Sequence, residues 1–383
     1  MRAMDTHAAP FTEAVRAAAA DGRTLRLRGG GTKDFWGAPH RGDVLDTRAH
    51  AGIVSYEPSE LVVTARCGTP LAELEAALAE KGQCLAFEPP HFGAAATVGG
   101  MLAAGLSGPA RASVGAVRDF VLGVRMVNGK GEDLTFGGQV MKNVAGYDVS
   151  RLLAGSWGTL GVVTEVSLKV LPVAPAEATL MCAGIPQHAA LDVLHRWGGQ
   201  PLPLNASAWV RDTTAEVAAD YLFVRLRGAV AAVQSALAKM GADAQAQGAQ
   251  VQVMDAAEAA QDWRASAEHT LQFFEPPSGE LCLWRLSVPQ TAPVIDLPYA
   301  QYIEWQGAQR WLWAPATAAQ ALREAAQRVG GQATLFRASV LGGASDKAVG
   351  VNPPLDAVQQ RIQRALQQEF DPQGVFATDR MGI

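Results

Sequence analysis

Three consecutive glycines, Gly29 to Gly31, follow a short alternating strand pattern and constrain this chain more than any other feature. Glycine has no Cβ, so it adopts positive φ angles easily and lets another group approach its backbone closely. The N–H groups of such a loop can form an anion-binding nest. Arg28 and Lys33 add positive charge beside the glycines, and Thr32 adds a hydroxyl donor. The loop therefore suits a pyrophosphate, although most glycine-rich turns are only turns.

Length and charge narrow the class of protein. A chain of 383 residues can form two or three domains, each with its own core. The net charge is −5 and there is no basic run, which disfavours nucleic-acid binding. No apolar stretch reaches the roughly 18 residues of a membrane span, and the N-terminus lacks the apolar core of a signal peptide. We therefore expect a cytoplasmic protein without a membrane span of its own.

Cysteines and histidines give no sign of a metal site. The four cysteines are far apart in the sequence and form no Cys-x-x-Cys pair, so an iron–sulfur cluster or zinc ribbon within this chain is not expected. The seven histidines are scattered and include no His-Glu-x-x-His pattern. Free and mostly buried thiols in a reducing compartment are the simplest interpretation.

The first 175 residues read as alternating helices and strands of one domain. An Ala-rich helix is expected over 11–20, and a second helix over 69–81 with Thr69 as its N-cap. Strands 120–127 and 132–136 flank Asn-Gly-Lys-Gly, which is a strong hairpin signal. A long strand follows over 160–171, with apolar residues at alternate positions.

A domain boundary is expected at Pro172 to Pro175, where the pattern changes. Residues 176–345 read as an α+β unit, an antiparallel sheet covered by helices, and residues 346–383 as a C-terminal segment. Five of the nine tryptophans lie between Trp263 and Trp313. The favoured interpretation is a sheet core filled with aromatic side chains, and the alternative is a partner interface.

Two further glycine-rich segments strengthen the first. Residues 93–108 contain five glycines and five alanines, so either an extended ligand or a closely packed helix can lie against this backbone. Gly100 and Gly105 have Walker A spacing but lack the Lys-Ser/Thr that follows it, and no G-x-G-x-x-G fingerprint of a Rossmann site is present. In the third segment, glycines 155, 158 and 161 lead into the long strand.

Five motifs, taken in chain order, carry a family resemblance. They are R-G-G-G-T-K, T-V-G-G-M-x-A, G-x-x-R-D-x-V-L-G-V, N-G-K-G and G-Y-D-x-x-R-L-L-x-G-S-x-G-T-L-G-V-V-T-E. Together they resemble the FAD-binding domain of the vanillyl-alcohol oxidase / p-cresol methylhydroxylase (PCMH) family, over about residues 24–172. The tail 370–376 is similar to that family's closing segment, and the stretch 142–151 most resembles the FAD-binding subunits of bacterial glycolate oxidases.

The resemblance implies a fold and a set of cofactor contacts. The fold is α+β: a two-part PCMH-type FAD-binding domain, an α+β cap domain with an antiparallel sheet, and a C-terminal segment that packs back on the FAD domain. The implied cradle of the FAD pyrophosphate is Arg28, Gly29, Gly30, Gly31, Thr32 and Lys33. The implied lining of the flavin and diphosphate is Thr97, Val98, Gly99 and Gly100. The adenine and ribose side would be shaped by Gly108, Gly115 and Asp119, and the isoalloxazine or adenosine contacted by Gly161, Val162 and Val163.

The chain also departs from the family pattern. Relatives with covalently attached flavin carry a histidine where this chain has Thr32, so we expect non-covalent FAD. Related 2-hydroxy-acid dehydrogenases carry a histidine-rich metal site, and this chain has no such cluster beyond residue 172. We therefore assign no metal and no catalytic base, although His91 could lie near the flavin. Candidate cations for a substrate carboxylate are Arg225, Arg285, Arg310 and Arg337.

The resemblance implies three functions in order of preference. The first is an FAD-binding subunit of a glycolate oxidase (glycolate dehydrogenase) complex, which oxidises glycolate to glyoxylate and works beside a homologous catalytic flavoprotein and an iron–sulfur subunit. Its electrons would pass to the respiratory chain, with the chain held at the inner membrane through those partners. The second is a self-sufficient FAD-dependent dehydrogenase of lactate or another 2-hydroxy acid. The third is a non-catalytic flavin-binding scaffold whose cap holds the partners.

Overall fold

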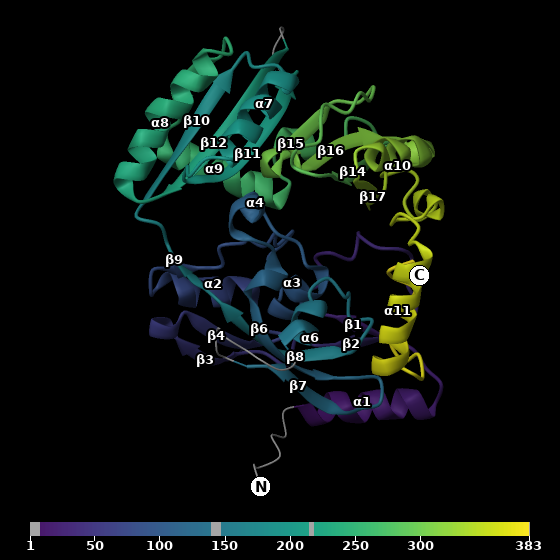
Figure 1. Cartoon of the computed structure of the whole chain (residues 1–383). Coiled ribbons are helices and arrows are strands. Elements are labelled where there is room, and N and C mark those ends of the chain that lie inside the picture. The colour runs from purple at the N-terminus through teal and green to yellow at the C-terminus, as the bar shows by residue number, and fades with distance from the viewer. Residues whose placement is uncertain (1–7, 139–146, 214–217, 383) are drawn as a thin grey trace. The chain divides into compact units, whose positions relative to one another are not determined.

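The computed structural model describes residues 8–138, 147–213 and 218–382, and the chain separates into two compact units (Figure 1). The first unit combines three stretches of chain, Met1–Leu106, Ala116–Val173 and Pro354–Ile383. The second combines Ser107–Gly115 with Ala174–Pro353. Residues 142–146 of the stretch that most resembles glycolate oxidase subunits lie outside the described residues.

A five-stranded antiparallel sheet forms the centre of the first unit, in the order β3-β4-β8-β6-β7. Its strands are β3 (Ile53–Glu57), β4 (Val62–Arg66), β6 (Val121–Val127), β7 (Asp133–Gly137) and β8 (Val162–Lys169). Of the seven residues of β6, six are buried, as expected of a strand with neighbours on both sides and packing on both faces. The predicted hairpin is β6–β7, and the predicted long strand is β8 followed by β9 (Leu171–Pro172), which pairs with β5 (Gln83–Cys84).

Short elements surround this sheet and position the glycine segments. The strand before the first glycine loop is β1 (Leu25–Arg28), which pairs in parallel with β2 (Asp43–Asp46). The helices of this unit are α1 (Ala9–Ala20), α2 (Leu71–Ala79), α3 (Val98–Ala104), α5 (Val117–Phe120), α6 (Tyr147–Leu152) and α11 (Ala357–Phe370).

The predicted N-cap of α2 is wrong. Pro70, in an extended conformation, occupies the N-cap position, and Leu71 is the first helical residue. The Thr69 hydroxyl instead bonds the backbone of Gly52, accepting from its N–H at 2.9 Å and donating to its carbonyl at 3.1 Å. The Thr69 hydroxyl thus bonds a neighbouring turn rather than the first turn of the helix.

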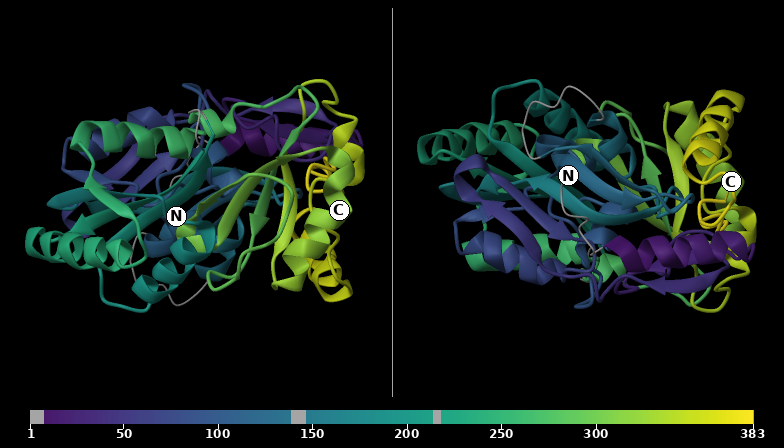
Figure 2. Two further views of the ribbon diagram at one scale, coloured as in Figure 1. Left: turned by 90° about the horizontal axis from the view of Figure 1, so that it is seen from above. Right: turned by 90° about the horizontal axis from the view of Figure 1, so that it is seen from below.

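The C-terminal segment packs into the core of the first unit, as the resemblance implied. Val375 and Phe376 are buried against Phe11 and Val15 of α1, and α1 lies beside the C-terminal part of the chain in Figures 1 and 2. The Leu25 N–H of β1 donates to the Val375 carbonyl at 2.7 Å. The first unit is therefore completed by the last residues of the chain.

The second unit is one eight-stranded antiparallel sheet with helices on both faces. The strand order is β13-β10-β12-β11-β15-β16-β14-β17. The strands are β10 (Ala176–Ala183), β11 (Leu204–Asp212), β12 (Ala219–Gly228), β13 (Gln250–Val253), β14 (Cys282–Ser287), β15 (Gln301–Glu304), β16 (Gln309–Ala314) and β17 (Gln332–Arg337). This confirms the expected antiparallel cap sheet and the α+β class.

Side-chain alternation separates the two faces of this sheet. Leu222, Val224 and Leu226 of β12 face the helices α7 (Gln187–Gly198) and α8 (Val230–Gln245), while α10 (Ala319–Arg328) covers β14, β16 and β17 on their Trp284 side. The remaining helix, α9 (Ala256–Glu268), packs on the opposite face, where the Trp263 indole donates to Thr179 of β10 at 3.0 Å.

The aromatic-rich stretch belongs to the interior of the second unit. Each of its five tryptophans is at most 7% exposed: Trp263, Trp284, Trp305, Trp311 and Trp313. Each indole N–H donates a hydrogen bond inside the unit. This burial favours the sheet-core interpretation over a tryptophan-built partner interface.

Candidate cofactor-binding site

The first glycine loop begins where β1 ends. Its turn is held by backbone hydrogen bonds from Asp34 to Gly31 and from Trp36 to Lys33, at 3.1 and 3.2 Å. Gly31 has a φ of 71°, which few residues other than glycine adopt. The Arg28 side chain lies over the turn and pairs with Asp34, Nε to Oδ2 at 2.9 Å, with both groups partly exposed.

Two glycines of this loop are required by close packing against the second glycine segment. A Cβ on Gly30 would lie 1.5 Å from the backbone oxygen of Ala95, and one on Gly29 would lie 2.4 Å from the Thr97 hydroxyl. No side chain fits either space, so Gly30 packs directly on the Ala95 backbone and Gly29 on the Thr97 side chain.

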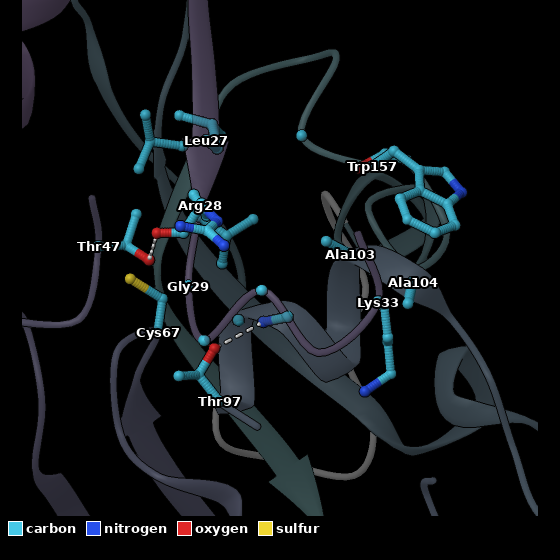
Figure 3. Close-up of a pocket in the computed structure, with 18 of the residues that line it drawn as sticks. Leu27, Arg28, Gly29, Lys33, Thr47, Cys67, Thr97, Ala103, Ala104 and Trp157 are labelled. Carbon is cyan, nitrogen blue, oxygen red and sulfur yellow. Dashed lines mark hydrogen bonds between the residues drawn. The ribbon is translucent and has the colours of Figure 1, made fainter. Parts of the chain in front are cut away.

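The second segment turns into α3 at Thr97. Its hydroxyl accepts a hydrogen bond from the Gly100 N–H at 3.2 Å, as Figure 3 shows, and Thr97 is 5% exposed. Gly99 is a second close-contact position, because its Cβ would lie 2.7 Å from the Cys67 Cβ. The small residues of α3 thus allow the helix to begin directly beside β4 and the first loop.

The third glycine segment lies against α3. Gly155 and Trp157 donate backbone hydrogen bonds to Leu102 and Ala103 at 2.9 and 3.0 Å. Gly158 has a φ of 74° and would bring a Cβ within 2.8 Å of Leu27, so this segment also approaches β1. All three segments, which are more than 120 residues apart at their extremes, therefore meet at one place in the first unit.

They line a single cleft, of which Figure 3 shows ten labelled residues. The predicted site residues that line it are Arg28, Gly29, Gly30, Gly31, Thr32, Lys33, Thr97, Gly99, Gly100, Gly161, Val162 and Val163. The other lining residues are Leu27, Asp34, Thr47, Cys67, Ala103, Ala104, Leu153, Ser156, Trp157, Gly158 and Arg380.

Four predicted site residues lie elsewhere. Val98 is the first residue of α3 and is fully buried, and the Asp119 carboxylate accepts the Ala116 N–H at 2.8 Å at the start of α5. Gly108 and Gly115 belong to the second unit, where the Gly108 carbonyl accepts the Trp305 indole N–H at 3.0 Å. These two glycines flank α4 (Arg111–Val114), which packs against β11.

Lys33 places a buried cation at the cleft. It is 8% exposed, and its ammonium donates to the His91 carbonyl at 3.1 Å and to the Thr32 hydroxyl at 3.4 Å. His91 itself turns its ring to α2, with Nε2 3.0 Å from Glu75 Oε2, and its side chain does not line the cleft. The loop around residue 91 therefore orients Lys33 rather than supplying an imidazole.

Cys67 lines the cleft, although no motif in the sequence predicts it as a site residue. It is 2% exposed, and burial raises the pKa of its thiol to about 12. A thiol with such a pKa stays protonated near neutral pH, and the protonated form is a poor nucleophile. Cys67 consequently acts as a small apolar wall of the cleft.

The four candidate cations of the second unit have different surroundings. Arg225 is buried, donates to Asn205 at 2.7 Å and stacks on Trp263. Arg310 is fully buried and donates to two backbone carbonyls. Arg285 and Arg337 instead lie close enough to His269 to lower the pKa of its imidazole, after the larger effect of burial.

His269 is held rigidly among aromatic rings. It ends α9 in a left-handed conformation and stacks on Phe274, with ring centroids 4.0 Å apart and planes 2° apart. Trp311 meets it edge-on at 4.6 Å. Burial lowers its pKa well below the usual value, so the imidazole is neutral at physiological pH and two guanidinium groups lie near it.

The second unit also contains a cavity of about 910 Å³, on the sheet face that carries α9. Hydrogen bonds connect residues that form its walls. The hydroxyls of Ser266 and Tyr302 are bonded at 2.9 Å, and the Trp313 indole donates to the Phe273 carbonyl at 2.7 Å. No predicted site residue lines this cavity. Across the described ranges there is no group of three His, Cys, Asp or Glu side chains that could hold a metal ion.

Sequence comparisons identify the cofactor of this chain. A model of the family described as FAD binding domain matches residues 6–148. The chain is 44% identical over 369 residues to glycolate oxidase subunit GlcE of Escherichia coli (strain K12), covering 96% of this chain and 95% of the relative. This chain belongs to the GlcE family. Its cofactor is accordingly FAD, and the resemblance found from the five motifs is confirmed.

More distant relatives of this GlcE-family chain match only about two fifths of it. D-lactate dehydrogenase of Archaeoglobus fulgidus is 36% identical over 149 residues, which is 38% of this chain and 33% of that protein. Glycolate oxidase subunit GlcD of Bacillus subtilis (strain 168) is 33% identical over 158 residues, with 40% and 33% coverage. These relatives place the chain among FAD-dependent oxidoreductases of hydroxy acids.

The fold has relatives among solved structures. An alkyldihydroxyacetonephosphate synthase superposes with a TM-score of 0.65 at 14% identity, over 96% of this chain and 74% of that one. At this identity the likeness concerns the fold alone. In the described part of the GlcE-family chain, no helix is both long and apolar enough to cross a bilayer.

Proposed function

We propose that this chain is the FAD-binding subunit of a glycolate oxidase complex that oxidises glycolate to glyoxylate and passes the electrons to partner subunits. The observation that carries this proposal is similarity to a glycolate oxidase subunit along nearly the whole of both chains, not only in the FAD-binding part. The convergence of three glycine segments on one cleft supports the same proposal, because each segment is needed to seat an extended dinucleotide.

Within the cleft, the chain's residues would bind and orient FAD. The glycine loop, from Arg28 to Lys33, would surround the diphosphate, with main-chain N–H groups and the buried Lys33 ammonium supplying positive charge. Thr97 fixes the start of α3 beside this loop, and Gly161 to Val163 would contact the cofactor along β8. FAD supplies the redox chemistry, and the protein supplies its position and surroundings.

FAD is held without a covalent bond in this proposal. Thr32 stands where covalent relatives carry histidine, the described residues that line the cleft include no histidine or tyrosine, and the Cys67 thiol is protonated. We expect acid precipitation to release the flavin completely into the supernatant, as followed by its visible absorbance. A yellow pellet after washing would show a covalent bond and contradict this prediction.

The partners proposed are a homologous catalytic flavoprotein and an iron–sulfur subunit, which would carry electrons to the respiratory chain at the inner membrane. The relative's designation as a subunit supports a multi-chain assembly. The four cysteines of this chain, none near another in sequence, agree with an iron–sulfur centre located on a different chain.

The alternative function is a self-sufficient 2-hydroxy-acid dehydrogenase. Oxidation of a hydroxy acid requires a base for the hydroxyl proton and a cation for the carboxylate. His269 lies near Arg285 and Arg337, but its ring packs against Phe274 and Trp311 and none of these three residues lines either cavity described above. The proposed complex and this alternative therefore differ in whether the chain alone turns over substrate.

Reconstitution separates these functions. We expect the purified chain to contain FAD but to reduce a dye with glycolate only after its partner subunits are added. Dye reduction by the chain alone with glycolate or D-lactate would support the self-sufficient enzyme. Full activity of the complex with an FAD-free form of this chain would reduce it to a scaffold and overturn the proposed function.

A further inference from the structure

Arg380 lines the cleft. It lies near the C-terminus and outside every motif of the FAD-binding domain. It is 8% exposed, and its Nη2 donates to the backbone carbonyls of Lys33 and Trp36 at 2.8 and 3.1 Å. These two residues begin and end the turn that follows the glycine loop. A guanidinium from the C-terminal tail thus fixes the far end of that loop.

Several contacts hold the Arg380 residue in place. Ala38 donates a backbone hydrogen bond to the Arg380 carbonyl at 2.9 Å, and the guanidinium lies over the Trp157 ring at 4.4 Å. Gly37 has a φ of 94°, and a Cβ there would lie 2.9 Å from Arg380 Cγ. Trp157 comes from the third glycine segment, so Arg380 contacts both the first and the third segments of the cleft.

The charge of Arg380 is only partly compensated within the protein. The carboxylate near it is Asp34, whose Oδ1 lies 3.9 Å from Nη1, beyond hydrogen-bonding distance, while Oδ2 of Asp34 pairs with Arg28. Its buried Nε has no hydrogen-bond partner among the described residues. A buried donor on a cation is costly when it is unpaired, and an anion in the cleft would remove that cost.

We propose that Arg380 is a diphosphate-binding residue and that the C-terminal tail acts as a latch that retains FAD. This inference rests on the proposed function, because it requires FAD in the cleft of the first unit. It adds a charged group to the glycine loop, and it makes cofactor affinity depend on the last residues of the chain. An anionic ligand matches the site better than a neutral one, since the guanidinium, Lys33 and the loop N–H groups converge on the same cleft.

Two variants and one control test the latch. In Arg380→Gln the charge is lost, whereas Arg380→Lys keeps the charge but cannot form both bonds of a planar guanidinium. The control is Arg41→Gln, an exposed arginine that pairs with Asp379 of the same tail at 3.0 Å. FAD affinity is measured by fluorescence titration of the FAD-free proteins, and their melting temperatures are recorded with and without FAD.

For Arg380→Gln we expect FAD affinity to fall by about 10- to 100-fold, the range of a charge-assisted hydrogen bond to an anion. The rise in melting temperature on adding FAD should shrink, and the melting temperature of the FAD-free form should also fall, because the carbonyls of Lys33 and Trp36 lose their donor. Arg380→Lys should recover part of the affinity, and Arg41→Gln should match wild type.

Two results would overturn the latch. One is unchanged FAD affinity in Arg380→Gln. The other is a lower melting temperature of the FAD-free variant with a normal FAD-induced rise, which would make Arg380 a purely structural residue. A wild-type protein that fails to bind FAD would instead remove the proposed function itself, so the two failures are distinguishable.

Discussion

The Gly30→Ala protein is expected to purify without FAD. The added Cβ would lie 1.5 Å from the Ala95 carbonyl oxygen. Because a Cβ and a backbone oxygen are both fixed by the backbone, neither can move away by a side-chain rotation. The glycine loop must therefore separate from the segment before α3, which opens the cleft at the place where the diphosphate would bind. Strain of about 2 to 3 kcal/mol is usual for such overpacking and corresponds to a loss of affinity of about 30- to 150-fold.

The measurement is the flavin content per protein after gel filtration. Gly199→Ala is the matched control, because its new Cβ would meet no neighbour closer than 3.7 Å and Gly199 has a negative φ. That variant should keep full flavin content. Full occupancy in Gly30→Ala as well would show that FAD does not need this contact and would remove the loop from the site.

Lys33→Glu is expected to lose FAD to a similar degree. The substitution places a carboxylate at a position that is 8% exposed, beside the expected diphosphate, and leaves the His91 carbonyl without its ammonium donor. Like charges at short range inside a protein repel strongly because water cannot screen them well. The change should also lower the stability of the FAD-free protein, since a buried carboxylate would replace an ammonium that is hydrogen-bonded to the His91 carbonyl.

Two companion variants separate charge from packing. Lys33→Met keeps the apolar stem without reversing the charge, so we expect an intermediate loss of FAD. Lys81→Glu makes the same change in net charge at an exposed position of the first unit and should retain wild-type flavin content. Equal retention of flavin in Lys33→Glu and Lys81→Glu after dialysis would falsify the assignment of Lys33 to the cofactor.

Much of the first unit could be predicted because its signals are local. Asn128 and Gly129 mark the turn between β6 and β7, and alternation of apolar residues marks β8. The glycine loop could be predicted for the same reason, because three consecutive residues without side chains favour a close approach to the backbone. Hairpin, strand and loop were therefore predicted close to their observed positions.

Contacts over long separations in sequence explain what was missed. Arg380 acts on Lys33 across 347 residues, and a single arginine near a chain end carries no periodicity. Segment Ser107–Gly115 lies between two stretches of the first unit, yet it clusters with the second. The Trp305 indole and Ser113, which bonds the Leu204 carbonyl at 2.7 Å, hold it there, and neither bond leaves a pattern in the sequence.

The order of the chain through the first unit has a consequence for biosynthesis. Val375 and Phe376 complete a core that begins at α1, and the tail borders the cleft. During translation, the N-terminal part of this unit lacks these core residues until the whole second unit has been synthesised. Domains often fold as they emerge from the ribosome, but this one can close only after Val375 and Phe376 have been synthesised. A chain truncated before this segment would lack residues that complete the core and border the cleft.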